Sequence, residues 1–98
     1  MPDNKVLIDL NFPDFQDQLF SLEQGEHRVL FKTLRKLRSL SWPSVYRDKG
    51  LNWEQIKDQP GRFTIRLSKR SRAVVRREGD HIRFISPHTD HDGAYARK

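Results

Sequence analysis

Four short stretches of the chain carry the apolar residues of β-strands, and Val6–Leu10 and Phe63–Leu67 alternate in the pattern of half-buried strands. The stretches are residues 6–10, 63–67, 72–77 and 81–86. Gly79 and Asp80 separate the last two stretches and predict a tight hairpin turn. Pro87 is expected to end the last strand, because proline removes a hydrogen-bond donor from the ladder.

Two segments between the first and second of these stretches repeat apolar residues at helical spacing. Residues 13–22 predict a short helix that begins at a proline, and residues 27–40 predict a longer one. Gly25 interrupts the pattern between them. The longer helix places its leucines on one face and five cations on the other: Arg28, Lys32, Arg35, Lys36 and Arg38. Ser41, Pro43 and Ser44 are expected to end it, residues 45–50 to form a polar connection, and residues 51–56 an element of uncertain type.

These elements predict an α+β fold, with one helix pair packed on one face of a mainly antiparallel sheet that includes the N-terminal strand. The 98 residues are expected to form a single domain (1–98) with a polar C-terminal tail at 88–98. A domain of this size has few large apolar groups to bury. Its bulky aromatic residues are therefore assigned to the core: Trp42, Trp53, Phe63 and Phe84.

The net charge of +6 is unevenly distributed. Residues 27–83 contain sixteen cations and five acids, a net of +11, whereas residues 1–26 have a net of −5. A basic domain of this size usually binds a polyanion, most often nucleic acid. The absence of cysteine excludes disulfides, thiolate metal sites and a cysteine nucleophile. The chain also lacks a signal-peptide pattern and a long apolar run, so a cytoplasmic protein without membrane contact is expected.

The acid-free stretch 62–77 is rich in arginine, whose guanidinium group binds phosphate in a bidentate manner. It favours a phosphodiester lying across a sheet, and the alternative is a charged surface that only maintains solubility. The candidate RNA- and phosphate-binding residues of this region are Arg62, Arg66, Lys69, Arg70, Arg72 and Arg76.

The C-terminal tail gathers two histidines, two carboxylates and a tyrosine within eight residues: His88, Asp90, His91, Asp92 and Tyr95. Histidine titrates near neutral pH and can move a proton in phosphoryl chemistry. A polar chain terminus or a metal site are the alternatives, but no other pair with ligand spacing supports a metal. Glu54 is a further candidate if the fold brings it near Arg66 and Arg72.

The sequence resembles the RelE/ParE superfamily of bacterial type II toxins over about residues 27–95. The resemblance rests on these stretches in this order: Gly50–Glu54, Phe63–Leu67, Arg72–Val75, the Gly79-Asp80 turn and His91–Tyr95. It implies an N-terminal helical hairpin packed on a small twisted antiparallel sheet. RelE-like members cleave mRNA in the ribosomal A site without a metal or other cofactor, and a cognate antitoxin protein neutralises them.

The resemblance also implies roles for single residues. Arg66 and Arg72 match the cations that face the RNA, and Glu54 resembles the glutamate base of one nuclease branch. Tyr95 resembles a C-terminal tyrosine of the family, and His88 or His91 resembles the histidine near it.

Two departures keep other functions open. Ser71 stands where an aromatic residue usually precedes the second arginine, and Asp90 and Asp92 stand where many nucleases carry an arginine. One alternative is therefore a ParE-like DNA gyrase inhibitor or an inactive family member. The other is a basic RNA-binding module outside toxin biology.

Overall fold

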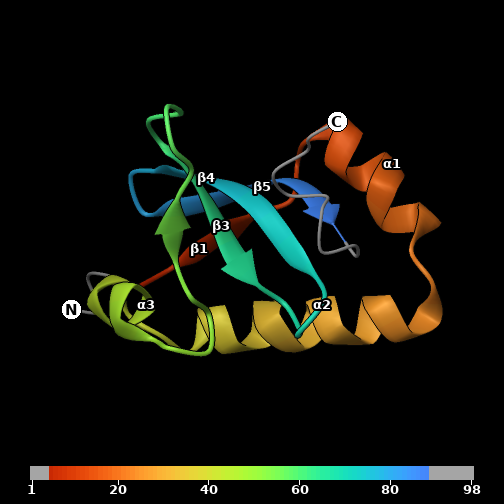
Figure 1. Cartoon of the computed structure of the whole chain (residues 1–98), viewed down its shortest axis with the longest axis horizontal. Helices are drawn as coiled ribbons and strands as arrows, with labels where there is room; N and C mark the ends of the chain where they lie inside the picture. Colours follow the sequence, from red (N-terminus) through yellow and green to blue (C-terminus); the bar gives the residue numbers. More distant parts are fainter. Residues whose placement is uncertain (1–4, 89–98) are drawn as a thin grey trace.

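A computed structural model of the chain describes residues 5–88 and shows an α+β fold in which helices pack on one mixed sheet (Figure 1). The helices are α1 (Pro13–Ser21), α2 (Gln24–Arg38) and α3 (Trp42–Arg47). The strands are β1 (Leu7–Asp9), β2 (Glu54–Gln55), β3 (Arg62–Arg66), β4 (Arg72–Glu78) and β5 (His81–His88). The predicted class and all four predicted strands are confirmed, and the uncertain element at 51–56 contains β2.

The five strands lie in the order β1-β5-β4-β3-β2. β1 is parallel to β5, and the other neighbours are antiparallel. Gly79 turns the chain between β4 and β5 with φ = 63°, a conformation that favours glycine. The prediction that Pro87 ends the last strand is wrong, because β5 continues to His88. β1 pairs with β5 only as far as Arg83, so one side of β5 is an edge at Pro87, where proline is tolerated.

Helix capping explains two further differences from the prediction. α2 begins at Gln24 and includes Gly25, because the side chains of Glu23 and Glu26 form a reciprocal capping box. Ser41 and Pro43 were expected only to end a helix, yet they begin α3. Ser41 caps it by accepting a hydrogen bond from the backbone N–H of Ser44, and proline is favoured in a first helical turn.

The hydrophobic core lies between the helices and one face of the sheet. Leu30, Leu34 and Leu37 of α2 are buried there, and Phe15 of α1 packs its ring against Phe84 of β5 with centroids 5.5 Å apart. Trp42 and Phe84 are buried as predicted. Trp53 and Phe63 are half-buried and stack on each other at the margin of the core, with ring centroids 4.5 Å apart. In Figure 1, α2 runs along one side of the sheet with α3 near its C-terminal end.

Two carboxylates fasten loops to this frame. Asp48 Oδ1 accepts hydrogen bonds from Lys36 Nζ and from the backbone N–H of Leu51, both at 2.9 Å. The bond from Lys36 is the main reason why the pKa of Asp48 lies below its ordinary value of 3.8. Asp9 accepts from the backbone N–H of Asn11 at 2.8 Å, and this bond is the main reason why its pKa is lowered as well.

We expect the free energy of unfolding to fall as the pH drops below about 4. A carboxylate whose pKa is lower in the folded state stabilises the protein above its unfolded pKa, and that stabilisation disappears as the pH falls through the folded pKa. Urea unfolding between pH 3 and 6 measures the effect. Asp48→Asn should lose stability at pH 6 and show a shallower decline toward pH 3. Identical pH slopes in the two proteins would contradict the assignment.

Candidate nucleic-acid interface

One face of the sheet is lined by arginine. Alternation along the strands puts Arg62, Thr64 and Arg66 of β3 on the same side as Arg72, Val74 and Arg76 of β4. These six residues define the arginine face. The opposite side carries Ile65, Ala73 and Val75, which are buried in the core against the helices.

The strand register arranges the cations of the arginine face in two transverse rows. Arg66 lies directly opposite Arg72, and the next strand continues this row with the backbone of His88. Arg62 lies opposite Arg76, and β5 continues that row with Arg83. Like charges directly opposite each other destabilise an antiparallel pair. Two such pairs on one face, with Thr64 and Val74 between them, therefore favour a surface that binds a polyanion.

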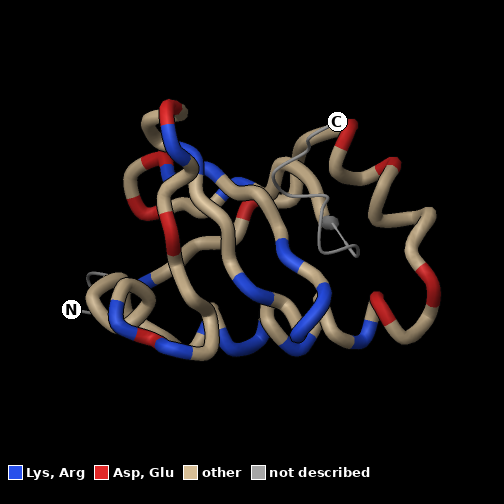
Figure 2. Tube along the Cα trace, in the orientation of Figure 1, with Lys and Arg blue, Asp and Glu red and all other residues tan. Residues whose placement is uncertain are grey.

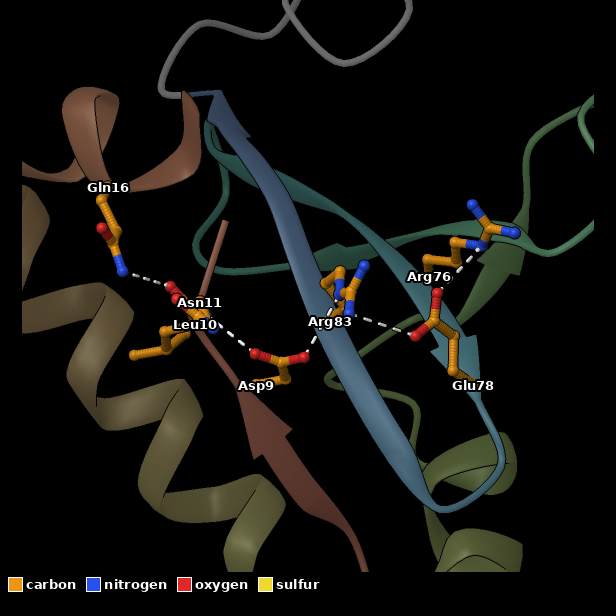
Figure 3. Close-up of polar contacts among 7 residues, drawn as sticks. All are labelled: Asp9, Leu10, Asn11, Gln16, Arg76, Glu78 and Arg83. Carbon is orange, nitrogen blue, oxygen red and sulfur yellow. Dashed lines mark hydrogen bonds and ion pairs between the residues drawn. The ribbon is translucent and has the colours of Figure 1, made fainter. Parts of the chain in front are cut away.

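The two rows differ in their ion pairs (Figure 3). Arg76 Nε lies 3.4 Å from Glu78 Oε2, and Arg83 Nη2 lies 3.5 Å from Glu78 Oε1. Arg83 Nε also contacts Asp9 Oδ2 at 3.2 Å. In contrast, Arg62, Arg66 and Arg72 form no ion pair within residues 5–88. The cations available to a ligand are therefore concentrated on β3 and at the start of β4.

Two buried polar atoms of the arginine face have no hydrogen-bond partner in the described part of the chain: Thr64 Oγ1 and Arg72 Nη1. Thr64 is only 1% exposed. It pairs with Val74, so Arg72 is its diagonal neighbour on β4, at a typical separation of about 7–8 Å. An unsatisfied buried polar group costs about 1–3 kcal/mol, so native proteins keep few of them.

Replacing Thr64 with valine is expected to raise the free energy of unfolding by about 1 kcal/mol. The two side chains have the same shape, and valine removes the hydroxyl that lacks a partner. Thr64→Ser is the matched comparison, because it keeps the hydroxyl and removes a buried methyl, and it should be less stable than the parent. Urea unfolding measures both variants. A valine variant less stable than the parent would show that the hydroxyl is satisfied in the free protein.

Glu54 also belongs to this face of the sheet. It is exposed on β2 and lies opposite Thr64 of β3. Arg66 follows Thr64 by two residues on β3 and therefore lies on the same face as Glu54. Of the other candidates, His88 ends β5 opposite Arg72, while His91 and Tyr95 lie outside the described residues. The structure thus brings Glu54, Arg66 and Arg72 together on one face.

The remaining cations of the arginine-rich stretch lie elsewhere. Lys69 and Arg70 are exposed in the loop between β3 and β4, where Arg70 lines a shallow pocket with Glu23 and Glu26 at the start of α2. Arg77 lies on the core side of the sheet. Its guanidinium is 3.9 Å from the centroid of the Trp42 ring and donates to the Tyr46 hydroxyl at 2.7 Å. Arg77 thus has a structural role.

The candidate site residues predicted from the sequence did not include Thr64 or the acids that pair with arginines on this side of the sheet. Strand alternation could have placed both Thr64 and Glu78 on the arginine face. Thr64 alternates with Phe63 and Ile65, which places it between two arginines. Glu78 lies two residues after Arg76 on the same strand and therefore on the same face.

The described residues define a small α+β protein with a basic sheet face, and Figure 2 shows cations along the strands of that sheet. Within them, no three His, Asp or Glu side chains are grouped so that they could hold a metal ion. Nor does any helix there have the length and apolar character needed to cross a membrane. The chain matches no protein-family model, and it matches no curated protein and no solved structure.

Proposed function

We propose that this chain is the toxin of a bacterial type II toxin–antitoxin system of the RelE/ParE kind, and that it cleaves mRNA on the ribosome. The observation that carries the proposal is the cross-strand pair of Arg66 and Arg72. Both lack an acidic partner among residues 5–88, and Arg72 keeps a buried Nη1 without a hydrogen bond. Such a pair is suited to the charge of a phosphodiester.

The arrangement of the elements supports the same proposal. Two consecutive helices, α1 and α2, precede β3, β4 and β5, and only Leu22 and Glu23 connect them. The RelE/ParE resemblance implies this order, with a helical hairpin before a small antiparallel sheet. The helices cover one face of the sheet and leave the four cations of the arginine face on the other.

The proposed reaction is attack by the ribose 2′-oxygen on the adjacent phosphorus. The P–O2′ bond forms, the P–O5′ bond breaks, and the products are a 2′,3′-cyclic phosphate and a free 5′-hydroxyl. Glu54 or a tail histidine, His88 or His91, takes the proton of the 2′-hydroxyl, and Tyr95 or His91 supplies a proton to the leaving oxygen. Arg66 and Arg72 stabilise the charge that develops on the phosphorane. A well-placed donor of this kind contributes about 3 kcal/mol.

The test combines purified protein, ribosomes and a defined mRNA, with mapping of the cleaved ends. We expect cleavage that requires ribosomes and leaves 2′,3′-cyclic phosphate ends. Intact mRNA together with inhibited DNA supercoiling would replace this function with the gyrase alternative. Salt-dependent RNA binding that needs no ribosome and produces no cleavage would favour the RNA-binding module. An antitoxin partner predicts a short adjacent reading frame whose product co-purifies with the chain and blocks cleavage.

A further inference from the structure

Figure 3 shows a continuous chain of ion pairs along the β1 side of the sheet. It runs from Asp9 through Arg83 and Glu78 to Arg76, with nitrogen–oxygen distances of 3.2, 3.5 and 3.4 Å. The four residues come from β1, β5 and β4, and their formal charges cancel. All four side chains remain between 21% and 52% exposed, so a ligand can reach them.

The two carboxylates pair with only some of the cations on this side of the sheet. Glu78 uses both of its oxygens, one for Arg76 and one for Arg83, so a phosphate that binds either arginine competes with this carboxylate. No acid of the described residues pairs with Arg62, Arg66 or Arg72. Charges within about 10 Å interact appreciably at 0.1 M salt. Glu78 and Asp9 therefore also repel a phosphate backbone that approaches the β5 and β1 side.

We propose that Glu78, assisted by Asp9, sets the edge of the RNA footprint, which is the set of arginines that contact the RNA backbone. Glu78 keeps Arg76 and Arg83 in internal ion pairs, so the phosphate backbone contacts only Arg62, Arg66 and Arg72. This inference rests on the proposed RNA-binding function of the arginine face. Glu78 is thus a specificity-determining residue that limits the contact length. The alternative is that these ion pairs only stabilise the folded protein, in which case removing Glu78 would not change RNA binding.

The test is the salt dependence of binding to a 12-nucleotide 2′-O-methyl oligouridylate, which 2′-hydroxyl attack cannot cleave. For single strands, the slope of log K against log salt changes by about 0.7 for each phosphate contact. Glu78→Gln keeps the size of the side chain and removes its charge. Freeing Arg76 should therefore steepen the slope by about 0.7 and tighten binding about fivefold at 0.1 M salt.

Two further variants test whether the steeper slope of Glu78→Gln comes from a new contact between Arg76 and a phosphate or only from the change in net charge. Asp17→Asn raises the net charge by the same amount at an exposed position on α1, and the slope should stay at the parent value. The double variant Glu78→Gln/Arg76→Gln removes the cation that the single variant releases. Its slope should return to the parent value.

The outcomes distinguish this inference from the proposed function. If the parent protein neither binds the oligonucleotide nor cleaves mRNA on ribosomes, the proposed function fails; if it cleaves mRNA on ribosomes without binding the oligonucleotide, only the footprint edge is overturned. If the parent binds but Glu78→Gln behaves like Asp17→Asn, the footprint edge is overturned while the function stands. A gain that persists in the double variant would also overturn it, because the released Arg76 would then not be the cause. Thermal unfolding of each variant checks that the fold is retained.

Discussion

Arg72→Ala is expected to lower ribosome-dependent mRNA cleavage by about 10²–10³-fold without loss of the folded state. The estimate is the usual cost of removing one preorganised donor from a charge-stabilising site. Folding should tolerate the change, because Arg72 forms no ion pair within residues 5–88 and its buried Nη1 has no partner there. Single-turnover cleavage on programmed ribosomes measures the rate, and thermal unfolding measures the stability.

Two further variants sharpen this prediction. Arg72→Lys keeps the charge but loses the planar fork, so it should restore only part of the rate. Arg28→Ala removes the same charge from an exposed position on α2, and its rate should stay within about twofold of the parent. If Arg28→Ala lost as much activity as Arg72→Ala, overall charge rather than the arginine face would determine cleavage.

Phe84→Ala is expected to reduce the free energy of unfolding by about 3–5 kcal/mol. The ring is completely buried, lies at the centre of the core and packs on Phe15 of α1. The residual cavity would therefore loosen α1 from β5. Small domains are stable by only about 5–15 kcal/mol, so this loss is a large fraction of the total.

Urea unfolding measures the loss, with Phe20→Ala as the matched control. Phe20 is 76% exposed on α1, so its truncation should change the free energy of unfolding by less than about 0.5 kcal/mol. Equal effects of the two substitutions would contradict the assignment of Phe84 to the centre of the core.

The periodicity of the sequence predicted which residues are strand and which side of a strand they occupy. Alternation placed Thr64 and Arg66 on one side of β3 and Phe63 and Ile65 on the other, because successive side chains of a strand point to opposite faces. The same logic identified α2 from its leucine spacing. These features are local, and a single strand or helix carries the whole signal.

Helix boundaries were predicted less well, because serine and proline are common both after a helix and at the start of one. Ser41 and Pro43 were expected to end the long helix, yet α2 already ends at Arg38, and the hydrogen bond from the Ser44 backbone N–H to the Ser41 hydroxyl marks the start of α3. Gly25 interrupts the hydrophobic pattern, yet the capping box of Glu23 and Glu26 continues the helix across it.

The net charge and its concentration in residues 27–83 were properties of the sequence alone, and so was the alternation that collects arginines on one face. Only the tertiary structure decided which of those arginines are available. Register between strands places Arg66 opposite Arg72, and the pairing of β1 with β5 brings Asp9 to Arg83 across 74 residues of chain. Such contacts depend on how distant segments pack, and no local pattern encodes them. The structure therefore separates Arg76 and Arg83, which form ion pairs, from Arg62, Arg66 and Arg72, which lack acidic partners among residues 5–88.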